Sequence, residues 1–482
     1  MPELIGRFRF STLVLVLFFS LVAQHEPAAA DPREKLLQGY LKKRASLRFE
    51  NSAGAPEARW FDQTIDHFPK PGSRWAGTTF KQRYFVDSEY AEGEESPVLF
   101  YVCGESACEG PSAVPLLNRL AKKYRAHRVA LEHRFYGNSQ PFELLTTRNL
   151  KVLSMDQAIE DLAQFQRYAQ SALNLRGKWV AVGGSYPGEL SAFYRMKHPE
   201  LVAGALASSA PVYAKADFFE YDRHVAKVAD PACLRRIQKV VSVVEGRLSS
   251  ATSRLQVKRL FQAEQVTHDV DFLYVLADMA AIAIQYGFQK QFCDALAGGE
   301  AQGLEVEAYA KTGLSLMGML GTSPLQDSFE GAMSLNPADY YEYAGRQWMY
   351  QSCTEFGYFQ VAFAEGSKSA RSSRIDLKYH NEACERMFGI QGQVDTARTN
   401  REYYSGLFDS NVRNIHFTNG SDDPWSNLSL TNEGELQGLN PGLSALFIQG
   451  AAHCDDLGSR MMAGLSEARS RFEELFFRWI SE

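Results

Sequence analysis

Ser185 stands in a local sequence that is typical of a catalytic nucleophile. Residues 183–188 read GGSYPG and follow a strand-like run. A strand that breaks into glycines, presents a serine and runs into a helix is the nucleophile elbow, because its tight turn excludes bulky side chains. The general elbow pattern G-x-S-x-G has glycine where this chain has Pro187. Proline is acceptable there because N–H groups in the first turn of a helix have no acceptor within the helix. The alternative is a serine that caps an ordinary helix.

Asp423 and His453 follow later strand-like runs and could activate this serine. A serine hydroxyl needs a base, and the base needs a carboxylate that orients it. In hydrolases with an elbow, these groups occur in the order Ser, Asp, His. Taken singly, Asp423 would belong to a turn before proline and His453 to a surface loop. Their order at strand ends predicts the triad Ser185, Asp423 and His453, with Asp422 as the reserve carboxylate.

The oxyanion of an acyl-transfer reaction needs backbone N–H donors. We expect one from Tyr186, the residue after the serine, and one from the loop that contains Gly104. Gly104 allows the backbone to approach the substrate closely. The next residue, Glu105, either is solvated or faces the site and meets a substrate amine.

The elements that must position these groups alternate between strand and helix in the first half of the chain. A capping box of Ser154 and Gln157 begins a helix, and a second helix runs from the elbow to His198. This alternation predicts an α/β-hydrolase fold with a mainly parallel sheet that helices cover on both faces. The strand-like runs are Gln82–Val86, Pro97–Cys103, Val129–Leu131, Trp179–Val182 and Leu201–Ala207.

Helical periodicity replaces this alternation in the middle of the chain, and the α/β pattern resumes afterwards at 414–418 and 445–448. A closing helix would place Leu465, Phe472, Phe476 and Trp479 on one face. We therefore expect an inserted helical cap. The predicted divisions are a signal peptide (1–30), the first part of the hydrolase domain (31–214), the cap (215–405) and the second part of the hydrolase domain (406–482).

The N-terminus resembles a secretory signal peptide: two arginines, an apolar run at 11–23 and small residues at 28–30. A membrane anchor is the alternative, but the run is shorter than the roughly 20 apolar residues that span a bilayer. Seven cysteines in an exported chain predict disulfides with at least one thiol left over. Cys454 is the candidate free thiol, and the plausible pairs are Cys353 with Cys384, Cys233 with Cys293, and Cys103 with Cys108.

Composition excludes several other classes of function. The formal net charge of −6 offers no basic patch for a phosphate backbone, so nucleic acid is not an expected partner. No His/Cys spacing resembles a metal site and no glycine-rich loop carries a phosphate-binding lysine, so we expect no metal and no cofactor. His133 follows a strand but precedes the serine, which suits a structural hydrogen-bonded position. The number of subunits is open, with a homodimer as one alternative.

Several further motifs lie across nearly all of the chain that would follow the signal peptide. They are WFDQTIDHF (60–68), EHRFYG (132–137), GGSYPG (183–188), LASSAP (206–211), RQWMYQSCTEFG (346–357), NGSDDPW (419–425) and GAAH (450–453).

With these motifs the chain resembles the serine peptidases that include lysosomal Pro-Xaa carboxypeptidase, dipeptidyl peptidase II and thymus-specific serine protease, and it looks closest to the thymus-specific branch. The resemblance implies the same triad and a cap that restricts access to chain ends and favours proline next to the cut bond. Trp425 would then supply a flat apolar wall for a proline ring. The chain has Cys454 where the lysosomal branches look as though they carry a second histidine.

The predicted activity is thus that of a serine exopeptidase on peptides with proline next to the cut bond. An esterase or lipase on the same scaffold is the alternative, because fold and triad do not fix the acyl substrate. A catalytically silent binding protein is a third reading, against which the intact triad argues. Asn419 and Asn427 lie in glycosylation sequons. We expect a location in the secretory pathway, with a secreted, lysosomal or vacuolar protein, or a periplasmic or extracellular one in a bacterium.

Overall fold

The computed structural model describes residues 56–340 and 343–482, which belong to one compact unit. The signal peptide predicted at 1–30 lies outside the described residues. Within them, no helix has both the length and the apolar character needed to cross a membrane.

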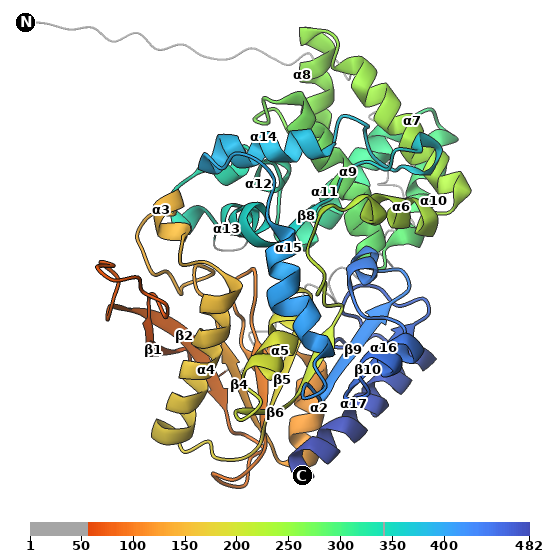
Figure 1. Cartoon of the computed structure of the whole chain (residues 1–482). Coiled ribbons are helices and arrows are strands. Elements are labelled where there is room, and N and C mark those ends of the chain that lie inside the picture. Colours follow the sequence, from red (N-terminus) through yellow and green to blue (C-terminus); the bar gives the residue numbers. More distant parts are fainter. Residues whose placement is uncertain (1–55, 341–342) are drawn as a thin grey trace, which may run out of the picture. The chain divides into compact units, whose positions relative to one another are not determined.

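An eight-stranded sheet forms the centre of this unit, in the order β1-β2-β4-β3-β5-β6-β9-β10 (Figure 1). All neighbours from β4 to β10 pair in parallel, whereas β2 pairs antiparallel with both β1 and β4. The predicted α/β-hydrolase class with a mainly parallel sheet is confirmed. The strands are β1 Arg59–Thr64, β2 Thr79–Asp87, β3 Val98–Val102, β4 His127–Leu131, β5 Trp179–Gly184, β6 Val202–Ser208, β9 Ile415–Gly420 and β10 Leu443–Ile448.

Helices cover both faces of the sheet because successive strand side chains point to opposite faces. Phe100 and Ala181 belong to the core shared with α4 (Met155–Ala172) and α5 (Tyr186–Lys197). Their neighbours Leu99 and Val180 belong to the core shared with α2 (Pro115–Tyr124) and α17 (Ala463–Ser481). On α17 the four predicted apolar residues are all buried. Nearly continuous apolar strands are therefore a consequence of burial on both faces.

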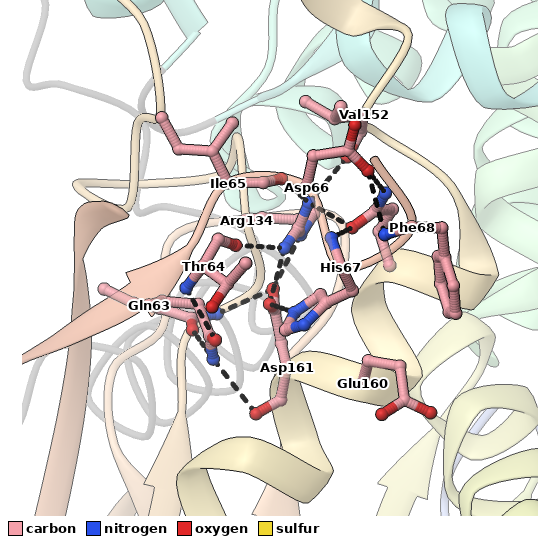
Figure 2. Close-up of polar contacts among 12 residues, drawn as sticks. Gln63, Thr64, Ile65, Asp66, His67, Phe68, Arg134, Val152, Glu160 and Asp161 are labelled. Atoms are coloured by element: carbon pink, nitrogen blue, oxygen red, sulfur yellow. Dashed lines mark hydrogen bonds and ion pairs between the residues drawn. The ribbon is translucent and has the colours of Figure 1, made fainter. Parts of the chain in front are cut away.

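Strand β1 was not predicted, because its sequence RWFDQT mixes apolar and polar residues and only two of the six are buried. Its end is fixed by a polar cluster around Arg134 and Asp161, drawn in Figure 2. Arg134 Nε and Nη2 donate to the Asp161 carboxylate at 2.6 and 2.5 Å, and Nη2 also donates to the carbonyl oxygen of Thr64 at 3.0 Å. His67 Nε2 lies 2.8 Å from the same carboxylate. The first and second sequence motifs therefore meet in a structural cluster.

Of the capping box predicted at the start of α4, the serine cap is present, whereas the side chain of Gln157 has other partners. Ser154 caps the helix by accepting the N–H of Gln157. The side chain of Gln157, however, binds the segment after β1: its oxygen accepts the N–H of His67 at 2.9 Å and its nitrogen donates to Asp66 at 2.7 Å. The amide of Gln157 is therefore engaged by one donor and one acceptor of that segment and does not complete a capping box.

Helices dominate the region between β6 and β9, and Figure 1 shows most of them gathered away from the large sheet. A short parallel pair, β7 (Lys215–Asp217) with β8 (Gly357–Phe359), forms a second sheet that the sequence did not indicate. The longer helices are α6 Phe219–Val228, α7 Pro231–Arg247, α8 Ala251–Leu260, α9 Asp269–Gln285, α10 Gln289–Glu300, α11 Glu305–Met319, α13 Gly345–Gln351 and α14 Leu377–Phe388.

All three predicted disulfides are present. They join Cys103 with Cys108, Cys233 with Cys293, and Cys353 with Cys384. Cys454 remains a free thiol, as predicted. The first bond closes the loop after β3 and the other two lie in the helical region, so cross-links support both the loop with Gly104 and the helices between β6 and β9.

Candidate active site

Ser185 lies between β5 and α5 in a strained turn. Its backbone has φ 67° and ψ −136°, in the positive-φ range that residues with a side chain seldom adopt. The serine is held there because its N–H donates to the carbonyl oxygen of Ser208 at 2.8 Å. A Cβ on Gly183 would lie 2.1 Å from the carbonyl oxygen of Pro187, so glycine is required before the serine. The turn therefore has the backbone of a nucleophile elbow.

His453 and Asp423 are hydrogen-bonded to each other. His453 Nδ1 lies 2.8 Å from Asp423 Oδ2, and both side chains are buried. Burial lowers the pKa of His453, but the Asp423 carboxylate outweighs that effect and raises this pKa well above its usual value. The other oxygen of Asp423 accepts the N–H of Trp425 at 3.0 Å. Asp422 instead accepts the hydroxyl of Ser421, so the carboxylate that orients His453 is Asp423.

The loop of His453 packs directly on the elbow. A Cβ on Gly184 would lie 2.8 Å from Cys454 Sγ, so the side chain of Cys454 packs closely on the backbone of the elbow. The N–H of Cys454 donates to the hydroxyl of Ser209 at 3.0 Å. Ser209 follows Ser208, the last residue of β6, whose carbonyl accepts the N–H of Ser185. Residues adjacent to Ser185 and to His453 are thus in contact. The structure brings the two loops together.

The loop after β3 packs against the first turn of α5. A Cβ on Gly104 would lie 2.3 Å from Pro187 Cγ, so the backbone of this loop approaches the elbow more closely than alanine would allow. Tyr186 is the first residue of α5, where N–H groups have no acceptor within the helix. The two predicted oxyanion donors therefore lie in adjoining segments.

A buried chain of hydrogen bonds holds the side chain of Tyr186. Its hydroxyl donates to His133 Nε2 at 3.0 Å and accepts from Gln351 Nε2 at 2.8 Å. His133 Nδ1 donates to the carbonyl of Arg134 at 2.7 Å, and Tyr136 donates to Gln351 Oε1 at 2.6 Å. Burial lowers the pKa of His133 to about 4, so its ring is neutral and can accept through Nε2. His133 has the structural position that its sequence context predicted.

Trp425 stands two residues after Asp423 in a cluster of aromatic side chains. Its ring packs against Phe218, Tyr221 and Tyr358 with centroid distances of 5.5, 5.5 and 5.4 Å. Trp348 continues the cluster, at 5.7 Å from Tyr186. These tilted and edge-on rings form a largely buried aromatic wall that joins the acid loop to Tyr186.

Glu105 is partly buried in the loop that contains Gly104. Burial raises its pKa, and the charge of His453 acts in the opposite direction. The charge of His453 therefore acts on Glu105, which remains partly exposed.

Gln285, the last residue of α9, was missed by sequence analysis. Its carbonyl accepts the N–H of His453 at 2.9 Å, while its Oε1 accepts the Trp425 indole N–H at 3.0 Å and the Tyr221 hydroxyl at 2.6 Å. The signal in the sequence is a lone amide at the end of the apolar run MAAIAIQ. In the described chain, no group of three or more His, Cys, Asp or Glu side chains is arranged to hold a metal ion.

The sequence matches the family model Serine carboxypeptidase S28 over residues 63–469. Among curated proteins, it is 37% identical to "Probable serine protease EDA2" of Arabidopsis thaliana, with 77% of this chain and 76% of that protein aligned. It is 30% identical to mouse thymus-specific serine protease, with 83% of this chain and 82% of that protein aligned. It is 27% identical to bovine lysosomal Pro-X carboxypeptidase, with 97% of each chain aligned. The chain therefore belongs to the S28 family and is a serine-type peptidase.

Proposed function

We propose that the protein is a serine exopeptidase in which Ser185 is the nucleophile, His453 the general base and Asp423 the carboxylate that orients it. The observation that carries this proposal is the hydrogen bond between His453 Nδ1 and Asp423 Oδ2, in a loop that packs on the elbow of Ser185 through Cys454 and Gly184. Because Nδ1 carries the proton of that bond, Nε2 is left to take the proton of the Ser185 hydroxyl.

In the proposed reaction, the Ser185 oxygen attacks the scissile carbonyl carbon while its proton passes to His453. The tetrahedral oxyanion is bound by the N–H of Tyr186 and an N–H of the segment at Gly104. His453 then returns the proton to the leaving amine, and the C–N bond breaks. Water, activated by His453, resolves the Ser185 ester and releases the acid. The burial of Asp423 and His453 favours this chemistry because charges interact more strongly away from water.

We further propose that residues 215–405 act as a cap over the site and that proline is favoured next to the cut bond. The hydrogen bonds from Trp425 and His453 to Gln285 support the first part, since they tie the helical region to the catalytic loops. The rings of Trp425, Tyr358 and Trp348 support the second, because flat apolar side chains match the faces of a proline ring. Two curated relatives are lysosomal Pro-X carboxypeptidases of cattle and mouse.

The proposed location is the secretory pathway, with release or delivery to a lysosome or vacuole. The three disulfides and the lysosomal relatives fit such a location. Both sequon amides donate to a backbone carbonyl, Asn419 to Leu430 and Asn427 to Pro424, but Asn419 is buried whereas Asn427 is exposed. Asn427 is therefore the proposed glycan acceptor.

The test is product analysis by mass spectrometry on two peptides, one with proline second from the N-terminus and one with proline second from the C-terminus. Release of an Xaa-Pro dipeptide or of a single C-terminal residue is expected, and it should disappear in Ser185→Ala. Replacing proline by alanine in each peptide provides the matched control for proline selectivity. Equal rates for both members of a pair would contradict the proline preference, and hydrolysis of small esters alone would select the esterase alternative.

A further inference from the structure

Glu189 is a buried acid that the triad does not use. It lies in the first turn of α5, where its N–H donates to the carbonyl oxygen of Ser185 at 3.1 Å. Only 1% of the residue is exposed, and its Oε2 has no hydrogen-bond partner among the described residues. Nearly all buried polar atoms in proteins have such a partner. An orphaned carboxyl oxygen one helical turn from Ser185 therefore indicates a group that a ligand completes.

The surroundings of this carboxyl group connect it to the aromatic wall. The Tyr358 hydroxyl lies close enough to the Glu189 carboxyl group to act on it as a hydrogen-bond neighbour. That hydroxyl has one proton, and it donates this proton to the carbonyl of Pro211. The ring of Tyr358 packs edge-on against Trp425 at 5.4 Å. The Glu189 carboxyl group is thus placed between the nucleophile helix and the wall that follows Asp423.

The charges around Glu189 have the same sign as its own carboxylate. The acidic groups that act on it are Glu355 and Glu105, and no cation of the described chain is among its electrostatic partners. Burial without a compensating charge raises the pKa of Glu189 well above its usual value. A positive charge that entered this region would stabilise the carboxylate, whereas a second carboxylate would be repelled.

We propose that Glu189 determines specificity by binding a cationic nitrogen of the peptide substrate. The cation is either the N-terminal ammonium or the charged end of a basic side chain. Because Glu189 lies one helical turn after Ser185, we expect the bound cation to belong to a substrate residue close to the cut bond. The inference rests on the proposed function, since it takes Ser185 as the nucleophile. If the cation is the N-terminal ammonium, the inference also favours cleavage from the N-terminus over cleavage from the C-terminus.

The experiment compares wild type with Glu189→Gln on two matched pairs of substrates. In one pair the residue before the cut bond is arginine or its neutral isostere citrulline, and in the other an Xaa-Pro amide has a free or an acetylated N-terminus. Wild type is expected to favour the cationic member of one pair by at least tenfold in kcat/KM, and that pair identifies the source of the cation. In Glu189→Gln this preference should fall to within about twofold.

A matched control is Glu355→Gln, which changes a buried acid whose oxygens already accept the N–H of Met155. This variant is expected to keep the preference. Fluorophosphonate labelling of Ser185 and a thermal melt show whether each variant is folded. A preference that survives in folded Glu189→Gln, or the lack of any preference in wild type, would overturn the inference.

Binding without turnover separates this inference from the peptidase assignment. Argininamide should protect Ser185 of wild type from the fluorophosphonate at lower concentration than citrullinamide does, and Glu189→Gln should lose this difference. Charge-dependent protection in an enzyme that cleaves no peptide would refute the exopeptidase proposal and support the role of Glu189. Peptide cleavage that is indifferent to charge, with no charge-dependent protection, would refute Glu189 alone.

Discussion

The backbone N–H of His453 donates to the carbonyl oxygen of Gln285 at 2.9 Å, so the end of α9 holds the loop of the proposed catalytic base. The side chain of Gln285 also accepts the indole N–H of Trp425, which follows the proposed acid Asp423. One residue of the helical region therefore supports the loops of both partners of Ser185. The geometry of the base depends on contacts from outside the sheet.

Replacing Gln285 by leucine should damage catalysis more than it damages binding. The variant leaves the buried donors of Trp425 and Tyr221 without an acceptor, and each orphaned donor costs about 1–3 kcal/mol. We expect a lower melting temperature and a reduced kcat, measured by calorimetry and steady-state kinetics. The exposed Gln291 on α10 provides the control Gln291→Leu, which should match wild type. A Gln285→Leu enzyme with wild-type kcat would contradict this role.

The neighbouring carboxylates Asp422 and Asp423 should differ sharply in importance. Asp423 bonds His453, whereas Asp422 accepts from Ser421. Asp423→Asn is expected to lower kcat by about four orders of magnitude, because the amide no longer selects the required ring tautomer. Asp422→Asn should stay within a few-fold of wild type. Similar losses in the two variants, measured on the same substrate, would refute the assignment.

The pH dependence of kcat/KM should show an acidic limb above the ordinary histidine pKa of about 6.5. The Asp423 carboxylate outweighs burial and raises the pKa of His453. The base works only when neutral, so activity is absent below that raised pKa and appears as the pH rises through it. A pH–rate profile of the free enzyme measures this limb. A limb at or below 6.5 would show that the ring is not held by an ionised carboxylate.

Alanine at Gly104 should disturb the oxyanion site without changing the triad. The added Cβ would lie 2.3 Å from Pro187 Cγ and force the loop away from the elbow. Loss of one oxyanion donor lowers kcat by about 10²–10³, and we expect a loss of this order. Gly298→Ala on α10 is the control, because a Cβ there meets nothing within 4 Å. Equal kinetics for the two variants would place Gly104 outside the site.

Cys454 should react slowly with alkylating reagents in the native enzyme. Burial raises the pKa of its thiol, while the charge of His453 acts in the opposite direction, so the thiol is protonated at neutral pH. Mass spectrometry should find one rapidly formed adduct after denaturation, when the three disulfides remain intact. The denatured protein serves as the control for reactivity. Rapid native alkylation at Cys454 would contradict its partly buried, protonated state.

The sheet and the triad segments could be predicted because their sequence signals are local. A continuous apolar strand, two glycines before Ser185 and loops at later strand ends each carry their own pattern. The disulfides were also predicted correctly, by pairing cysteines that lie within one region of the chain. Asp423 and His453 come together because the carboxyl ends of parallel strands meet at one edge of the sheet.

The contacts that join distant segments could not be predicted in this way. Gln285 binds His453 through its backbone carbonyl and Trp425 through its side-chain amide. The sequence around Gln285 does not show that these loops are its partners. Glu189 looks like an acid that favours a helix N-terminus, and only its burial and orphaned oxygen set it apart. Strand β1 is held by Arg134 and Asp161 rather than by its own apolar pattern. These features depend on tertiary partners.

The most direct test of the central claim is the site of covalent labelling by a fluorophosphonate. Intact mass and peptide mapping of the treated enzyme should show one adduct on Ser185, formed in step with the loss of peptidase activity. Labelling should be absent in Ser185→Ala and strongly slowed in His453→Ala. An adduct on another residue, or peptide cleavage that persists in Ser185→Ala, would contradict the account.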